Sequence, residues 1–292
     1  AEAVALRRAG ISKPLVVLQG FANKDELGLC VEYDLQPVIH QQWQAELLYT
    51  ASRYCIDVWL KIDTGMHRLG VPPEAVDETC QTLRSSAVVG DIRFMSHFAN
   101  ADYPAHPLNN IQLETFIKVL SKYDAERSIA NSAAVLSRAD SHLEWVRPGI
   151  MLYGTSPLHD RTAAQLGLKP AMQFETRLCA VQQIRKGEAI GYGSTWQCPE
   201  DMPVGVVAAG YGDGYPRHAP SGTPVWINNQ LCPSVGRVSM DSICVDLRGV
   251  DAVPGDRVVL WGRELSVDII ASQAETISYE LLCHAGNTAN PG

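Results

Sequence analysis

Helical patterns and short β-branched runs alternate through the first 160 residues of this chain, and this alternation constrains the fold more than any other feature. The strand-like runs are PLVVL, PVIH, IDVWLKID, VVGDIRFMSHF, RSIAN and EWVRPGIMLYG. The helical stretches are EAVALRRAG, KDELGLC, QQWQAELLYTAS, PPEAVDETCQTLRSS, residues 108–125 and SAAVLSRA. Six strands joined by helices predict a parallel sheet with both faces covered, as in a β/α barrel or a doubly wound sheet.

After about residue 165 the pattern becomes one of alternating runs separated by turn signals. These runs are QFETRLCAVQQI, VGVVAAG, PVWI, PSVGRVSM, ICVDL and DRVVLWG, followed by the helical patterns SVDIIASQAE and ISYELLCHA. INNQ predicts a tight hairpin turn, because asparagine tolerates positive φ. We therefore predict an α/β domain with a parallel sheet over residues 1–165 and a mainly antiparallel β domain over residues 166–292.

Composition narrows the classes of partner. The net charge of −8, without basic clusters, argues against a nucleic-acid groove, since phosphate backbones are bound through Lys and Arg. No apolar run is long enough to span a membrane, and the first residues lack a signal-peptide pattern. Eight widely spaced cysteines and eight histidines without zinc-ligand spacing predict reduced thiols, no metal, and a cytoplasmic protein that binds small molecules.

A lysine interrupts an otherwise apolar strand in IDVWLKID. The strand period places Lys61 on the face opposite Val58 and Leu60, which in a barrel points inward near the end where active sites gather. Two interpretations stay open from this stretch alone. One is a structural ion pair with Asp63 or Arg68, and the other is an amine ready to form a Schiff base.

Two further strand ends carry polar residues. His97 and Asp102 follow one strand in SHFANAD, where the alternative is a satisfied surface histidine. Asn131 and Ser132 open a helix directly after another strand, and Gly149 follows the last one. Free amides at a helix start attract anions and glycine permits close approach, so these residues predict a phosphate site, with simple helix capping as the alternative.

Three glycine-rich stretches mark the second half: AIGYGSTW, AAGYGDGYPR and VGRVSMD. A tyrosine flanked by glycines can approach a substrate and act as a base, although ordinary turn chemistry in a β domain explains the same composition.

Together these stretches resemble the alanine racemase family, pyridoxal-phosphate enzymes built from a β/α barrel and a C-terminal β domain. The resemblance covers nearly the whole chain and rests on LKIDTGMHRLG, SHFANAD, ANSAA, RPGIMLYG, IGYGSTW, GYGDGYPR and VGRVSMD in the family's order and approximate spacing. It implies an isomerase that interconverts L- and D-alanine by two-base proton transfer, as a homodimer with shared active sites, and that supplies D-alanine for the cell wall.

The resemblance also implies roles for single residues. Tyr192 matches the base that takes the α-proton from L-alanine and comes from the partner subunit, and His97 matches the histidine that hydrogen-bonds it. Arg147 matches the arginine that keeps the pyridine nitrogen unprotonated, and Arg68 the one beside the cofactor phenolate and substrate carboxylate. The remaining matches are a phosphate cradle of Ser132, Gly149 and Ile150 with Asn131 beside it, a carboxylate contact at Met240, and an entrance lined by Asp102, Tyr211, Arg217, Arg237 and Asp241.

The second base of this family is the Schiff-base lysine, in a motif of the type V-K-A-N-A-Y-G-H-G at the end of the first barrel strand. The sequence contains no such motif, and Lys61 matches a lysine that is commonly carbamylated and orients the arginine matching Arg68. We therefore expect a racemase sequence without its first two barrel strands. The ending HAGNTANPG also departs from the family's usual Arg-Val-Pro stretch. The alternatives are an inactive fragment or non-covalent cofactor-binding module, and another racemase or decarboxylase of this barrel class.

Overall fold

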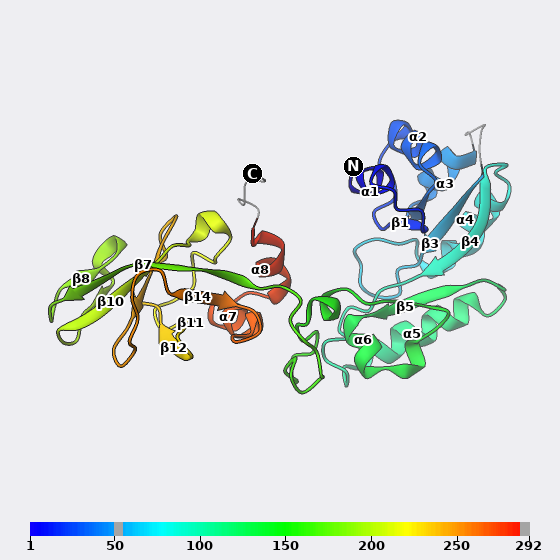
Figure 1. Ribbon diagram of the computed structural model, residues 1–292. Helices are drawn as coiled ribbons and strands as arrows, with labels where there is room; N and C mark the ends of the chain where they lie inside the picture. The colour runs from blue at the N-terminus through cyan, green and yellow to red at the C-terminus, as the bar shows by residue number, and fades with distance from the viewer. Residues whose placement is uncertain (50–54, 287–292) are drawn as a thin grey trace. The chain divides into compact units, whose positions relative to one another are not determined.

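The computed structural model describes residues 1–49 and 55–286, which form two compact units (Figure 1). The first unit comprises Ala1–Gly149 with Leu158–Asp160, and the second comprises Ile150–Pro157 with Arg161–Gly292. Each unit has its own sheet and core, and each is described by itself. None of the helices within the described residues is long and apolar enough to cross a membrane.

The first unit is a six-stranded parallel sheet of the β/α-barrel type, in the order β1-β2-β3-β4-β5-β6. Its strands are β1 (Leu15–Val17), β2 (Leu35–Ile39), β3 (Ile56–Lys61), β4 (Val89–Met95), β5 (Arg127–Asn131) and β6 (Trp145–Arg147). Its α-helices are α1 (Glu2–Arg8), α2 (Lys24–Glu32), α3 (Gln42–Tyr49), α4 (Val76–Arg84), α5 (Pro107–Leu120) and α6 (Ser132–Ser137). The predicted rotation of strands and helices is confirmed, except that the end of the helix expected over QQWQAELLYTAS lies outside the described residues.

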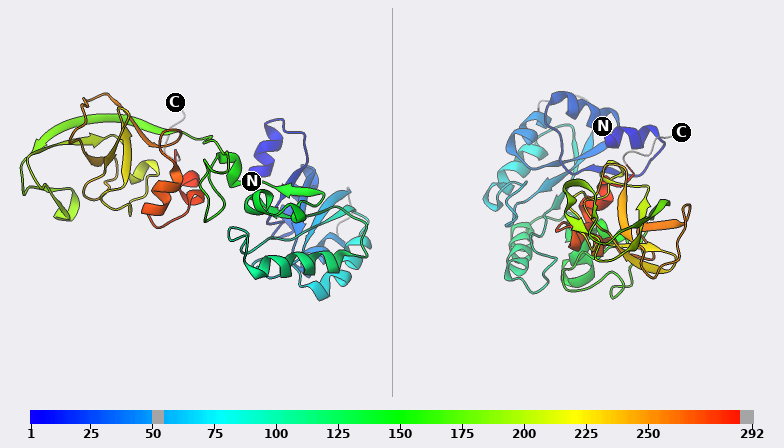
Figure 2. Two further views of the ribbon diagram at one scale, coloured as in Figure 1. Left: turned by 90° about the horizontal axis from the view of Figure 1, so that it is seen from below. Right: turned by 90° about the vertical axis from the view of Figure 1, so that its left-hand side faces the viewer.

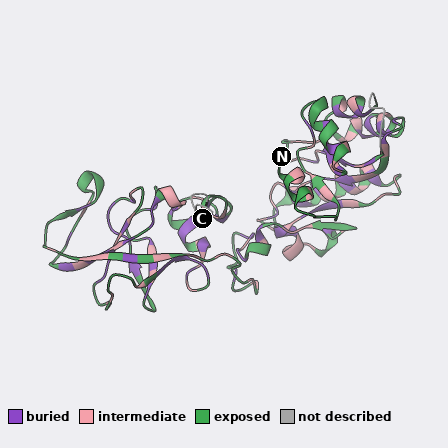
Figure 3. Ribbon diagram, turned by 45° about the horizontal axis from the view of Figure 1, so that its top comes forward, coloured by how far each residue is buried: buried purple, intermediate pink, exposed green. Residues whose placement is uncertain are grey.

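Burial explains why the sequence forms this sheet. The helices lie along the sheet in Figure 2, and buried residues concentrate on the strands in Figure 3. Val38, Val58 and Leu60 are fully buried in neighbouring strands β2 and β3. Parallel strands covered on both faces read as nearly continuous apolar runs, which is the pattern of β3.

The second unit is an antiparallel sheet in the order β12-β11-β14-β7-β10-β13, with a small two-stranded sheet β8-β9. The strands are β7 (Phe174–Ile184), β8 (Ala189–Ile190), β9 (Trp196–Gln197), β10 (Met202–Val207), β11 (Pro224–Ile227), β12 (Gln230–Pro233), β13 (Ile243–Asp246) and β14 (Arg257–Trp261). Helices α7 (Val267–Gln273) and α8 (Ser278–His284) follow, as predicted. A core that includes Trp261, Val225 and Val258 fills this unit.

The hairpin predicted at INNQ is confirmed, because Asn228 and Asn229 have φ of 45° and 64° between the paired strands β11 and β12. The strand expected over PSVGRVSM is wrong. Pro233 ends β12, Ser234 makes an isolated bridge to Val245, and residues 235–240 form an irregular loop in which Gly236 has φ 73°. The strand lies earlier, at β12, whose exposed side chains conceal the usual apolar signal.

Candidate functional site

Four polar side chains come to one edge of the parallel sheet, because the carboxyl ends of parallel strands lie together. Lys61 ends β3, His97 follows β4, Asn131 ends β5 and Arg147 ends β6. The strands pair in that order, with Lys61 opposite Met95 and Asn131 opposite Arg147. The structure therefore gathers these predicted site residues of the first unit at a single sheet edge.

Arg147 is held by acceptors on both of its terminal nitrogens. Nη1 donates to Ser128 Oγ over 2.6 Å, and Nη2 donates to the Ser96 carbonyl over 2.5 Å. The same Nη2 lies 3.3 Å from His97 Nδ1. Burial lowers the pKa of Arg147 to about 10, which leaves the guanidinium charged at neutral pH. Arg147 is therefore a fixed, permanently protonated donor at this edge.

The arginine determines which tautomer His97 adopts. A charged guanidinium has no lone pair to offer, so Nδ1 of His97 accepts and the ring proton sits on Nε2. Burial, followed by the charges of Arg147, Lys61 and Arg68, lowers the pKa of His97 to about 4. His97 is consequently a neutral imidazole with Nε2–H available as a donor.

Lys61 is buried and, within residues 1–49 and 55–286, its amine makes no hydrogen bond or ion pair. The ion pair with Asp63 that the sequence allowed is not formed. Asp63 Oδ1 instead accepts from the backbone N–H groups of residues 65, 66 and 67. Burial and the charges of Arg68 and Arg147 lower the pKa of Lys61 to about 8. Its amine therefore loses its proton far more easily than an ordinary lysine.

The cradle predicted for a phosphate is built where β5 passes into α6. Asn131 caps the helix by accepting from the Ala134 N–H over 3.1 Å. Ser132 Oγ accepts from the Gly149 N–H over 2.7 Å, which brings the end of β6 against the helix start. A Cβ on Gly149 would meet only Ser132 Oγ, at 3.8 Å. Among the described residues, neither a close neighbour nor a positive φ requires glycine there, so this position is open to close approach by a ligand.

Two predicted residues of the first unit lie on its loops. Arg68 is exposed, and its charge acts on both Lys61 and His97. Asp102 is half-buried, and its carbonyl accepts from the backbone N–H of His159 over 3.2 Å. His159 stacks on Tyr103 with ring centroids 3.9 Å apart, so an aromatic pair adjoins Asp102. Ile150, the last predicted member of the cradle, begins a 3₁₀ turn and belongs to the second unit.

In the second unit Tyr192 stands on an exposed glycine turn. It is 67% exposed and begins a 3₁₀ turn (η4, Tyr192–Ser194) between Gly191 and Gly193, whose φ angles are 72° and 76°. A Cβ on Gly193 would lie 3.1 Å from Arg237 Nη1. The turn therefore presents the phenol to solvent, and the Arg237 guanidinium lies against Gly193 of the same turn.

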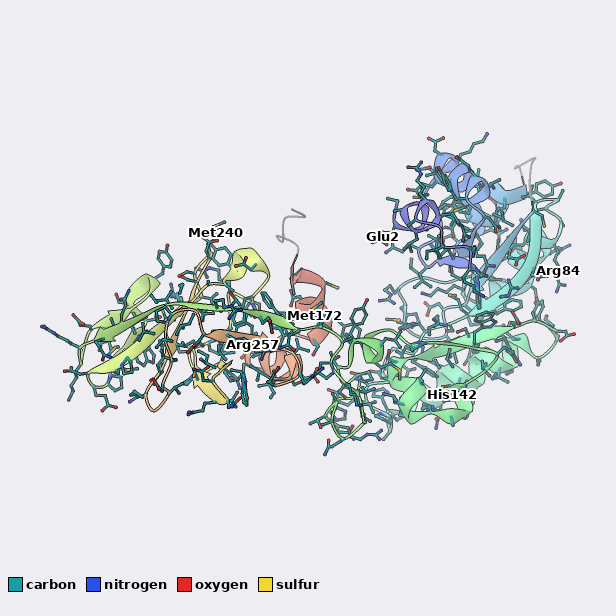
Figure 4. All side chains as sticks on the ribbon, viewed as in Figure 1. Glu2, Arg84, His142, Met172, Met240 and Arg257 are labelled. Carbon is teal, nitrogen blue, oxygen red and sulfur yellow. The ribbon has the colours of Figure 1, made fainter. Side chains whose placement is uncertain are left out.

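The other two glycine-rich stretches of the second unit are bonded to each other through their backbones. Tyr211 N–H donates to the Ser239 carbonyl and Gly212 N–H to the Met240 carbonyl, at 3.0 and 2.8 Å. Arg217 lies over the Tyr211 ring. Met240, labelled in Figure 4, is 56% exposed, and Asp241 beside it is also exposed. Tyrosine, arginine and aspartate side chains thus share one loop cluster.

Sequence reasoning missed the buried polar residues that hold the first unit's site. These are Ser96, Ser128, Thr64 and Gln112. A signal was available for two of them, since Ser96 and Ser128 are hydroxyl residues inside apolar strand runs. A buried hydroxyl needs a partner, and such serines therefore mark hydrogen-bonded networks.

A parallel sheet of the β/α-barrel type followed by an antiparallel β domain is the architecture expected of barrel amino-acid racemases. Comparison with known proteins agrees with this class. The profile of the alanine racemase N-terminal domain matches residues 1–157, and that of the alanine racemase C-terminal domain matches residues 171–290. This chain belongs to the alanine racemase family and is an isomerase.

Single relatives give the same result. The alanine racemase of Halorhodospira halophila is 50% identical over 97% of this chain and 78% of its own length. The crystal structure of the biosynthetic alanine racemase from Pseudomonas aeruginosa is 43% identical, with a TM-score of 0.94 over 99% of this chain and 81% of that one. The alanine racemase structure from Acinetobacter baumannii has a TM-score of 0.92 at 38% identity, over 98% and 81% of the two chains.

Proposed function

We propose that this racemase interconverts L-alanine and D-alanine with pyridoxal 5'-phosphate as its cofactor. The observation that carries the proposal is the Arg147–His97 contact, in which a cation that keeps its proton fixes a neutral imidazole as an Nε2–H donor. The names of the relatives support alanine as the substrate.

The residues present fit the phosphate and the pyridine nitrogen of this cofactor, whereas the family's Schiff-base lysine motif is absent from the printed sequence. Ser132, Gly149 and Ile150 would hold the phosphate, with Asn131 keeping the helix start in place. Arg147 would face the pyridine nitrogen, where a donor that does not give up its proton keeps that nitrogen unprotonated. Arg68 and the Met240 backbone would bind the substrate carboxylate. When bound, pyridoxal phosphate supplies the electron sink that makes an amino acid's α-hydrogen acidic.

The proton transfers require one base on each face of the substrate. The Tyr192 phenolate would take the α-proton from L-alanine, and the Nε2–H of His97 would hydrogen-bond the phenol oxygen. We place this pair across the interface of a homodimer, so that each subunit completes the other's site. The substrate entrance would be lined by Asp102, Tyr211, Arg217, Arg237 and Asp241. The enzyme would act in the cytoplasm, and its product D-alanine would be used for the cell wall.

Lys61 is proposed as a carbamate. The ammonium group would first lose one proton, which burial makes easier. The free amine would then attack the carbon of CO₂ and release a second proton to solvent, so that a buried cation becomes an anion beside Arg68. Intact-mass measurement in bicarbonate should show one added CO₂ that is absent from Lys61→Met. If the wild type gains no CO₂, the lysine is not carbamylated.

Two measurements test the function. Purified protein supplied with pyridoxal phosphate should convert L-alanine into D-alanine faster than it converts serine, and preference for another amino acid would reject alanine as the substrate. Borohydride reduction followed by peptide mapping then tests whether any lysine bonds the cofactor, and no label on any peptide would support the non-covalent binding module. A label on Lys61 would reject its role as a carbamate.

A further inference from the structure

Gln112 is a buried amide that the proposed chemistry does not use. It lies on α5, is fully buried, and uses both ends of its carboxamide. Oε1 accepts from the Ala99 N–H over 2.9 Å, and Nε2 donates to the His97 carbonyl over 2.9 Å. Because the Ala99 N–H can only donate, the amide has one allowed orientation. Gln112 therefore closes the turn that carries His97 at both of its ends.

The same Nε2 begins a directed chain of hydroxyl groups. It lies 3.4 Å from Thr64 Oγ1, which lies 2.7 Å from Ser96 Oγ, and Ser96 Oγ donates to the Ile62 carbonyl over 2.9 Å. Each hydroxyl has one proton, so Thr64 must donate to Ser96 and accept from Gln112. This chain joins the loop after β3, which leads to Arg68, to the end of β4.

Helix packing brings Gln112 against that loop as well. A Cβ on Gly65 would lie 3.5 Å from Gln112 Cγ and 3.3 Å from Leu108 Cδ1. At the other end of the chain, the Ser96 carbonyl accepts from Arg147 Nη2. The Gln112 side chain thus contacts the two loops that carry Arg68 and His97. Its hydrogen bond to the His97 carbonyl lies one residue from Ser96, whose carbonyl holds Arg147.

We infer that Gln112 is a positioning residue for the racemase site, because its carboxamide locks the loops after β3 and β4 together and holds His97 against Arg147. The inference rests on the proposed function for its kinetic consequences, although the geometry of His97 can be measured without turnover. Gln112 itself touches no reacting group.

The test compares Gln112→Met with Gln44→Met in the full chain, with pyridoxal phosphate bound. Gln44 is the matched control, since it is equally buried, donates to the Phe21 carbonyl over 2.9 Å and accepts from the His40 N–H over 2.8 Å. Nitrogen-15 NMR of His97, assigned with His97→Gln, should show the Nε2–H tautomer in wild type and in Gln44→Met. In Gln112→Met the tautomers should mix and the pKa should rise toward 6.5.

The kinetic expectation is a fall in kcat on the order of 10- to 100-fold for Gln112→Met with KM little changed, since a misplacement of about 1 Å has such a cost. Both methionine variants should lose similar thermal stability. If Gln112→Met does not fold, Gln112→Glu carries the test, because it keeps the shape and the acceptor for Ala99. If Gln112→Met leaves the tautomer and pKa of His97 unchanged, the positioning role is wrong, whatever the activity of the variant. An inactive wild type would overturn only the proposed function.

Discussion

The two units hold their site residues by different physical means. In the first unit, Arg147 and His97 are desolvated and fixed by buried side chains such as Ser128 and Gln112. In the second, Tyr192 and the loop cluster around Tyr211 are exposed and held by glycines and backbone hydrogen bonds. Low-dielectric surroundings shift pKa values, whereas solvent-exposed loops present side chains to ligands and partners. Function and stability are therefore coupled at His97 in the first unit and separable at Tyr192 in the second.

The largest effect should come from removing one hydroxyl in the second unit. Tyr192→Phe should slow α-proton removal from L-alanine about 10³-fold, within the range for a general base, while removal from D-alanine falls far less. Hydrogen exchange of each enantiomer in D₂O measures the two faces separately. Melting should be unchanged because the side chain is 67% exposed, and Tyr49→Phe, 60% exposed in the first unit, is the control. Equal losses for both enantiomers would reject the assigned face.

In the first unit a site residue should instead make stability depend on pH. The pKa of His97 is lowered from 6.5 to about 4, so between these values the unfolded chain binds the proton that the folded chain refuses. The contribution of neutral His97 to the free energy of unfolding is complete above pH 6.5. It is lost as the pH falls toward 4, by at most about 3 kcal/mol. Comparing wild type with His97→Gln in urea unfolding at pH 7 and pH 4.5 isolates the effect. Parallel curves would contradict a depressed pKa.

Two glycines should respond differently to one added methyl group. A Cβ on Gly210 would lie 2.2 Å from the Ser239 carbonyl oxygen and 2.3 Å from that of Met240, so Gly210→Ala must separate the second unit's loops at a cost of about 2 kcal/mol. Gly149→Ala meets only Ser132 Oγ at 3.8 Å and should keep its melting temperature. Its affinity for pyridoxal phosphate should nevertheless fall about tenfold, or about 1.4 kcal/mol. Unchanged affinity would mean that Gly149 does not line the cradle.

The smallest effect concerns the helix cap beside that cradle. Asn131→Ala removes the acceptor for the Ala134 N–H and should lower the stability of the protein by about 1 kcal/mol. Asn131→Asp keeps an acceptor and should recover stability. Because a carboxylate repels phosphate, the aspartate variant should still bind pyridoxal phosphate more weakly, as fluorescence titration would show. If Asn131→Asp recovers both the stability and the affinity for pyridoxal phosphate, Asn131 acts only as a helix cap.

Much of the fold could be predicted because its signals are local. Strand runs such as IDVWLKID and helix starts such as Asn131 depend on neighbours within a few residues. The prediction failed at PSVGRVSM, where an alternating pattern is a loop because Gly236 takes positive φ. It also missed β12, because an edge strand with exposed side chains has little apolar signal.

The sequence by itself determined the order of strands and helices, the residues at the strand ends, and the resemblance that identified the family. Only the tertiary structure decided the charge states and the hydrogen-bonding directions at the site. The sequence allows an ion pair between Lys61 and Asp63, but in the structure the backbone N–H groups of residues 65–67 bind the Asp63 carboxylate. His97 becomes a neutral Nε2–H donor because Arg147, fifty residues further on, meets its Nδ1. Periodicity is encoded between neighbours along the chain, whereas a pKa depends on charges and burial brought together across it.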